Sequence, residues 1–310
     1  MPARKLIMTL YRLCWIVFIA LVIVHAVAGG LPFNWWLIWL PAVAALTLGV
    51  VLSRRTRAEE GGTRPPAVEV AAPVTGRWSA LNSPADKVPS HGTYGYGQAY
   101  AIDIVAEPKP GARPSFSWLW PVVRRSRAFP AYGEPLLAVA DATVVHATDR
   151  QRDHLSRNSL LSLLYLLIAE AFVRELGGAR WIVGNHLVLD LGDGTYAMYA
   201  HLQRGSLAVR AGDRVSAGQQ LARCGNSGNS SEPHVHFQLM DNPDLNVARG
   251  IPFRWQGIGV PAGGETFESG PEAREAERAE WGERGERGER AERGEWAGLG
   301  QEGPRATNFG

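Results

Sequence analysis

Residues 186–200 read HLVLDLGDGTYAMYA, and this stretch decides the fold class. Two strand-like runs, 186–191 and 195–200, are separated by Gly192-Asp193-Gly194. Two such runs joined by a glycine-containing turn are typical of an antiparallel hairpin. We therefore predict antiparallel strand pairing here.

Further strand-like runs lie on the N-terminal side of this hairpin, at 100–105, 136–140 and 142–146. Together they predict a mostly β domain, an antiparallel β-sheet or sandwich, over residues 77–262. The apolar segment 159–176 (SLLSLLYLLIAEAFVREL) has a helical composition and predicts an inserted helix. This helix either packs on the sheet or touches a bilayer surface beside a membrane anchor.

The first 57 residues carry two apolar segments, at about 13–28 and 35–52. Each approaches the roughly 20 residues that span a bilayer. We predict a transmembrane helical hairpin; the alternative is a signal peptide cleaved after Ala28 and followed by one anchor. Basic residues flank both segments and the loop between them is uncharged, so the positive-inside rule places both ends in the cytoplasm.

The remaining regions are predicted from composition. Residues 58–76 indicate a linker, and the Glu/Arg/Gly-rich residues 263–310 indicate a disordered tail. The formal net charge is only +2, with acids and bases interleaved, so we expect no nucleic-acid partner. Cys14 lies in an apolar segment and Cys224 in a glycine-rich loop, so we expect no disulfide within the domain.

The chemistry is concentrated at residues 224–239, CGNSGNSSEPHVHFQL. A Gly/Asn/Ser-rich loop leads into a strand that carries His234 and His236. Side chains two apart share one face of a strand, so both imidazoles point the same way. Such a pair is suited to a site that combines a metal with a base.

Upstream residues provide possible partners for this pair. His91 lies in a turn-like sequence, Asp103 on a strand between isoleucines, and His201 at a strand end. A carboxylate on an apolar strand is costly to bury unless it is paired or binds a metal, and imidazole with carboxylate suits Zn²⁺. We expect the other four histidines to be incidental, structural or on the surface: His25, His146, His154 and His186.

The region from about Trp78 to Phe253 resembles the lysostaphin/LytM-type zinc metalloendopeptidases, which cut peptide cross-links in bacterial peptidoglycan. The resemblance rests on four features in order: His91 followed by Asp103, Tyr199-Ala-His-Leu202, the hairpin sequence 205–219, and Gly225-Asn-Ser-Gly leading to Pro233-His-Val-His-Phe237.

The resemblance implies that His91, Asp103 and His236 bind one Zn²⁺, and that His201 and His234 share the roles of general base and transition-state stabiliser. Two features depart from the compact members of the family. Eleven residues separate His91 from Asp103, where compact members have three, and insertions occur at 107–133 and 150–181.

Two other functions are compatible with parts of this sequence. A non-catalytic relative would bind cell wall or activate another wall hydrolase, but such proteins typically lack ligands that this chain retains. A lipoyl- or biotinyl-type carrier would need a lysine at its hairpin tip, and none lies between Ala208 and Leu221. The implied peptidoglycan substrate places the domain outside the cell membrane, in conflict with the charge bias of the anchor.

Overall fold

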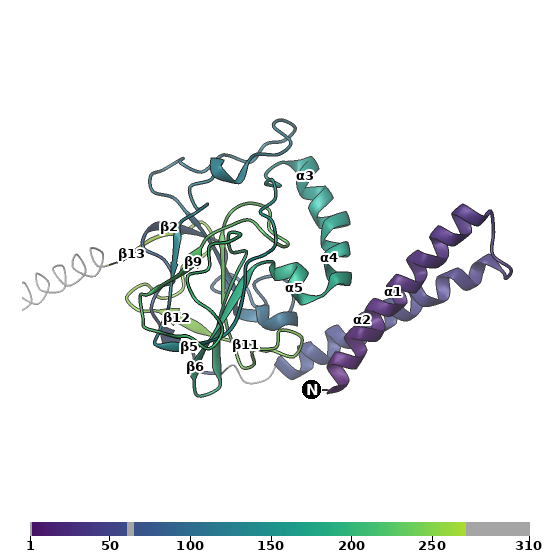
Figure 1. Ribbon diagram of the computed structural model, residues 1–310, viewed down its shortest axis with the longest axis horizontal. Coiled ribbons are helices and arrows are strands. Elements are labelled where there is room, and N and C mark those ends of the chain that lie inside the picture. Colours follow the sequence, from purple (N-terminus) through teal and green to yellow (C-terminus); the bar gives the residue numbers. More distant parts are fainter. Residues whose placement is uncertain (1, 61–64, 271–310) are drawn as a thin grey trace, which may run out of the picture. The chain divides into compact units, whose positions relative to one another are not determined.

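An antiparallel sheet forms the centre of the fold. The computed structural model describes residues 2–60 and 65–270. The sheet has nine strands in the order β13-β2-β3-β10-β7-β6-β5-β8, with β11 paired to β10 (Figure 1). Its strands are β2 (Gly76–Asn82), β3 (Ile102–Ala106), β5 (Ala142–Thr148), β6 (His186–Gly192), β7 (Thr195–Ala200), β8 (Arg214–Val215), β10 (Val235–Met240), β11 (Gly250–Ile251) and β13 (Thr266–Ser269). The predicted antiparallel β fold is confirmed.

The predicted hairpin is formed by β6 and β7. Leu187 pairs with Tyr199, and the strands run antiparallel from there to the turn. Asp190 Oδ1 accepts the backbone N–H of Gly192 at 2.9 Å. Gly192 and Gly194 both have positive φ, 90° and 77°, which glycine adopts at little steric cost. The turn therefore forms where the sequence places its glycines.

Alternation along the central strands separates an apolar face from a polar one. On β10, Val235, Phe237 and Leu239 point into the main hydrophobic core. His236 and Gln238 alternate with them and therefore lie on the other face. Each side chain on this strand is buried, so the polar face is also enclosed.

Two small sheets complete the β structure. β1 (Val68–Val70) pairs in parallel with β12 (Phe253–Trp255), and β4 (Pro135–Leu137) pairs with β9 (Gln220–Arg223) in antiparallel fashion.

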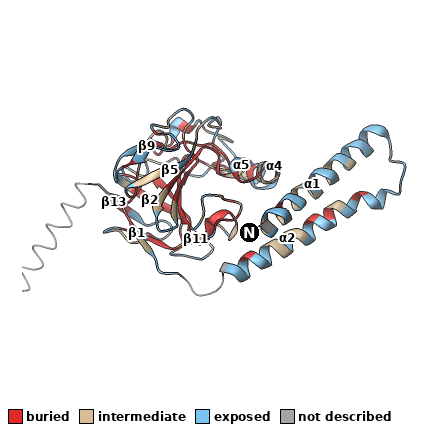
Figure 2. Cartoon of the chain, turned by 60° about the horizontal axis from the view of Figure 1, so that its bottom comes forward, coloured by how far each residue is buried: buried red, intermediate tan, exposed pale blue. Residues whose placement is uncertain are grey.

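Two long helices precede the sheet. α1 (Pro2–Ala28) is followed by the short η1 (Trp35–Ile38) and by α2 (Trp39–Glu60). Both long helices are apolar and long enough to cross a membrane, and most of their side chains are exposed (Figure 2). Asn34 begins η1 by accepting the N–H of Trp36 at 3.2 Å. The predicted pair of apolar helices is therefore present.

The insertion at 159–176 is helical, but it is not one regular helix. α3 (Leu160–Tyr165) continues into the π-helical η4 (Leu166–Glu170) and then α4 (Ala171–Gly177), with α5 (Ala179–Val183) after a break at Gly178. Ser159 caps α3 by accepting the N–H of Ser162. These helices lie along one side of the sheet (Figure 1). Short 3₁₀ segments are η2 (Gly95–Tyr100) and η3 (Ser126–Ala128).

Two segments predicted to be irregular contribute strands. The linker at 58–76 contains the end of α2, all of β1 and the first residue of β2, and the tail at 263–310 contains β13. β1 has only three residues, too few for a recognisable pattern, and its partner β12 lies far away in the sequence. The rest of the predicted disordered tail, 271–310, is outside the described residues.

Candidate metal centre

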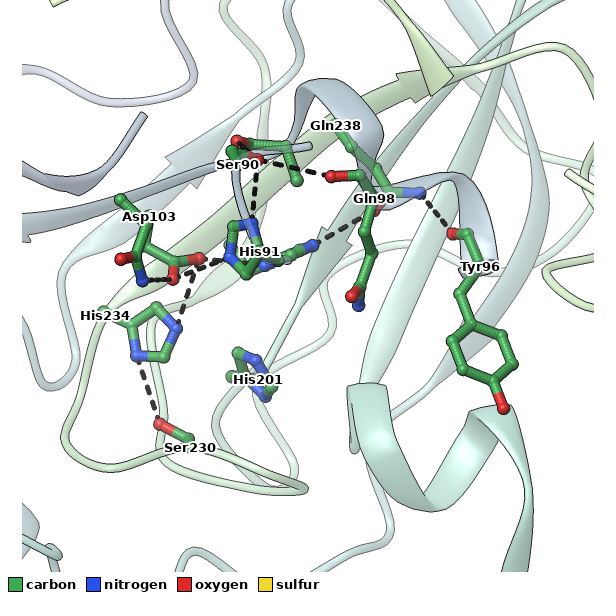
Figure 3. Close-up of polar contacts among 12 residues, drawn as sticks. Ser90, His91, Tyr96, Gln98, Asp103, His201, Ser230, His234 and Gln238 are labelled. Carbon is green, nitrogen blue, oxygen red and sulfur yellow. Dashed lines mark hydrogen bonds and ion pairs between the residues drawn. The ribbon is translucent and has the colours of Figure 1, made fainter. Parts of the chain in front are cut away.

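The five predicted site residues lie close together on the polar face of the sheet (Figure 3). His236 of β10 is in register with Asp103 of β3 on one side and with Ala200 of β7 on the other. His201 directly follows β7, and His234 directly precedes β10. His91 reaches the same place from the loop before η2.

Three of these residues surround a common point. Asp103 Oδ2 lies 2.9 Å from His91 Nε2, and Asp103 Oδ1 lies 2.9 Å from His236 Nδ1. The ligand atoms of the three residues all lie within 4.8 Å of one another. Two imidazoles and one carboxylate form a donor set that catalytic zinc sites use, so these residues fit the metal that the sequence predicts.

Neighbouring polar groups determine which nitrogen of each histidine in this cluster faces Asp103. Gln238 Nε2 donates to the carbonyl of Tyr96 at 2.8 Å, so Gln238 Oε1 must accept from His236 Nε2–H at 3.1 Å. His236 is then left with an unprotonated Nδ1 beside Asp103. Such partners orient ligating histidines and set their tautomer.

Ser90 acts on His91 in the same way. Its hydroxyl donates to the carbonyl of Ala101 at 2.7 Å and therefore accepts from His91 Nδ1–H at 3.0 Å. In the neutral tautomer that this contact selects, the Nε2 of His91 is the free nitrogen, and it is directed at Asp103. The carboxylate is also held by Asn82, whose Nδ2 donates to Oδ2 at 2.8 Å.

The two remaining histidines form a pair beside this cluster. The ring centroids of His201 and His234 are 4.8 Å apart. His201 Nδ1–H donates to the carbonyl of Ser227 at 2.8 Å, and His234 Nδ1–H donates to that of Glu232 at 2.7 Å. In its neutral form each ring therefore has an unprotonated Nε2. The Nε2 of His234 lies 3.5 Å from Asp103 Oδ1.

Burial and charge adjust the protonation of the cluster. Burial would raise the pKa of Asp103, but the adjacent imidazoles hold it well below its usual range. Burial lowers the pKa of His236, and burial with neighbouring imidazoles lowers that of His201 well below its usual range. Burial would also lower the pKa of His234, but Asp103 and Glu232 raise it. An ionised Asp103 and a neutral His236 are the forms that bind a cation.

Glycines in the loop before β10 allow it to pack closely behind His201. A Cβ on Gly225 would lie 2.3 Å from the backbone nitrogen of Gln203, and one on Gly228 would lie 2.4 Å from that of Gly184. This close approach brings the carbonyl of Ser227 to His201. His201 itself has a φ of 60°, in the left-handed region that residues other than glycine rarely adopt.

Both insertions contact this loop at Glu232. Arg113, from the first insertion, forms an ion pair with the Glu232 carboxylate. Asn158, from the second, donates to Glu232 Oε2 at 2.8 Å. The backbone carbonyl of the same residue accepts from His234 Nδ1–H, so the insertions hold a residue that contacts one of the two histidines outside the cluster of His91, Asp103 and His236.

A separate cavity of about 1180 Å³ lies beside the inserted helices. It is lined by residues that include His146, His186 and Trp181, and by none of the five clustered residues. His146 and His186 stack at 4.5 Å, and burial lowers the pKa of His186 to about 4. These histidines lie outside the metal centre.

Three residues that support the cluster, Gln238, Ser90 and Asn82, were not predicted from the sequence. A signal existed for Gln238, because it lies two residues after His236 and so shares its face. No comparable signal existed for Ser90, whose position depends on the folded loop, or for Asn82, whose position depends on a bulge in the pairing of β2 with β3.

Comparison with known proteins agrees with the resemblance that the motifs indicate. Residues 168–246 match the family model "Peptidase family M23". The glycyl-glycine endopeptidase ALE-1 of Staphylococcus capitis is 38% identical over 80 residues, which are 26% of this chain and 22% of that protein. The peptidoglycan DD-endopeptidase ShyA of Vibrio cholerae is 31% identical over 78 residues, or 25% of this chain and 16% of that protein.

The chain therefore matches less than a quarter of the length of either relative. Among solved structures, the catalytic domain of lysostaphin from Staphylococcus simulans is 18% identical, with 57% of this chain and 88% of that chain covered and a TM-score of 0.30. The family match includes His201, His234 and His236, whereas His91 and Asp103 precede it and are placed by geometry.

Proposed function

We propose that this chain carries a Peptidase family M23 domain and that the domain is a zinc metalloendopeptidase that hydrolyses peptide cross-links of bacterial peptidoglycan. The observation that carries the proposal is the cluster of His91, Asp103 and His236, whose ligand atoms lie within 4.8 Å of one another. The names of the two relatives include both a glycyl-glycine and a DD-endopeptidase, so the proposal extends to peptidoglycan peptides as a class.

His91 and His236 would hold the metal through Nε2 and Nδ1, because Ser90 and Gln238 occupy their other nitrogens. Asp103 would be the third ligand and the negative charge of the site. Bound zinc supplies a Lewis acid that polarises the scissile carbonyl and makes hydroxide available near neutral pH. Three protein ligands leave one position open, as in catalytic rather than structural zinc sites.

His201 and His234 would carry the proton transfers. In its neutral form each presents an unprotonated Nε2, because its Nδ1–H is given to a backbone carbonyl. In this form an imidazole accepts a proton from the attacking water, and in its protonated form it donates to the developing oxyanion or to the leaving amine. We assign these roles to the pair jointly.

We further propose that α1 and α2 anchor the chain in the cell membrane, with the domain outside, where peptidoglycan lies. The flanking basic residues have partners in the domain: Lys5 forms an ion pair with Asp244, and Arg12 lies 3.8 Å from Glu175. A topology reporter fused after residue 57 tests this placement. An external signal is expected, and a cytoplasmic signal would contradict action on mature cell wall.

The activity is tested by incubating the full chain, in detergent micelles, with cross-linked peptidoglycan. We expect release of cross-linked peptides that a chelator abolishes and added zinc restores. His236→Ala should be inactive, whereas His146→Ala, which removes an exposed histidine outside the cluster, should retain activity. If the native chain binds zinc and cell wall but releases no peptides, it is the non-catalytic relative instead.

A further inference from the structure

The inserted helix exposes its apolar side. Leu161, Leu164, Tyr165 and Ile168 have helical spacing and lie on one face of α3 and η4, and all four are exposed, Ile168 by 72%. The residues that the helix buries are Ser162 and Leu166. A surface helix normally directs such an apolar stripe at the core. Here the stripe faces outward.

An exposed aromatic tip lies next to this stripe. Trp118, Leu119 and Trp120 are exposed by 73%, 68% and 83%. Hydrogen bonds hold both ends of the tip at the start of α3: the N–H of Leu160 donates to the carbonyl of Ser117 at 3.1 Å, and the hydroxyl of Ser159 donates to that of Val122 at 2.7 Å. We call residues 118–120 together with the exposed stripe of 161–168 the apolar platform.

The inserted helical segment that carries the platform also contacts α1, through α4. Phe172 of α4 packs edge-on against Trp15 of α1, with ring centroids 5.2 Å apart. Arg12 contacts Tyr96 of the domain at 3.1 Å and is the last charged residue before the apolar run 13–28. The inserted helix therefore meets α1 at the level where α1 becomes wholly apolar, which is where a membrane–water interface would lie.

We propose that the apolar platform lies on the surface of the phospholipid bilayer that holds α1 and α2. This inference rests on the proposed membrane anchoring. Tryptophan prefers the membrane interface, and an amphipathic helix lies in the interface plane with its apolar face in the lipid. Arg125 and Arg127, exposed shortly after the tip, are placed to meet anionic headgroups.

The platform also connects to the metal centre. Asn158, next to the Ser159 that holds the tip, donates to the Glu232 carboxylate, and the Glu232 backbone carbonyl accepts from His234. A bilayer that holds the platform would therefore also hold the loop that carries His234, and the centre would face peptides close to the membrane surface.

The test places a single fluorescent label at chosen positions of the full chain, in vesicles that contain phosphatidylglycerol. Cys14→Ala removes the accessible thiol, while Cys224 stays because it is buried and its thiol pKa is raised well above the usual value. New cysteines replace Leu119 in the platform, Val22 in α1 as the membrane reference, and Ser216 in an exposed polar turn as the control. Quenching by a nitroxide lipid and by aqueous iodide is measured for each.

We expect the nitroxide lipid to quench the labels at 119 and 22 several-fold more than the label at 216. If the label at 22 is quenched but that at 119 behaves like 216, the anchor stands and the platform proposal is overturned. A label at 119 shielded from both quenchers would overturn it too, because a protein would then cover the tip. If the label at 22 is not quenched by lipid, the membrane anchor is wrong and the platform proposal falls with it.

Discussion

Replacing Gln238 with Leu tests whether the sheet sets the tautomer of His236. Gln238 accepts from His236 Nε2–H at 3.1 Å and donates to the buried carbonyl of Tyr96 at 2.8 Å. Leucine can do neither, so the His236 proton is free to move to Nδ1, the nitrogen that faces Asp103. Loss of such a partner typically weakens metal binding by about 10–100-fold. The unpaired carbonyl should also lower the free energy of unfolding by about 1–3 kcal/mol.

Gln238→Glu is the matched control. A carboxylate still accepts from His236 Nε2–H but cannot donate to the Tyr96 carbonyl, so stability should fall while the tautomer is kept. Zinc affinity is measured by competition with a chromogenic chelator on the full chain, and stability by denaturant unfolding. We expect the glutamate variant to keep most of the affinity that the leucine variant loses. A leucine variant with native affinity would refute the tautomer argument, and equal losses in both variants would assign the effect to packing.

Three further predictions concern other parts of the domain. His201→Asn, which tolerates the φ of 60° at this position, should keep zinc but lower kcat by about 10²–10⁴-fold; an unchanged kcat would exclude His201 from proton transfer. The pKa of His186 is about 4 in the folded chain and about 6.5 in the unfolded chain, so the unfolded chain binds more protons between these two values. The free energy of unfolding should therefore fall by about 2 kcal/mol as the pH drops from about 8 to about 5. Denaturant unfolding should show a smaller fall in His186→Gln, and an equal fall would contradict the assignment. Gly225→Ala should lower both stability and peptidoglycan cleavage, because its Cβ would clash with the Gln203 backbone; native values for both would show that the loop can move aside.

Local patterns predicted those parts of the molecule whose structure is decided locally. The hairpin at 186–200 carries its glycines where φ is positive, and the His-x-His at 234–236 follows the alternation of one strand. Both were found where the sequence placed them. The separation of His91 and Asp103 by eleven residues is accommodated by the loop 92–101, which includes η2 and folds back so that the Ser90 N–H donates to the carbonyl of Ala99.

The parts that were missed depend on distant contacts. β1 is a strand only because β12 pairs with it, and Glu232 is held by two insertions whose contacts no sequence pattern encodes. The segment 159–176 predicted a helix, but periodicity does not say what covers an apolar stripe. In the structure the inserted helices lie beside the sheet, but the apolar stripe of 161–168 is exposed. This exposure favours contact of the stripe with a bilayer over packing on the sheet.

The zinc content of site variants tests the central claim most directly. The account predicts one zinc per native full-length chain, one in His201→Asn, and none in Asp103→Ala or His236→Ala, since only the latter two remove atoms of the three-ligand cluster. Zinc retained in His236→Ala, or lost in His201→Asn while the variant remains folded, would contradict the division of the cluster into ligands and proton-transfer residues.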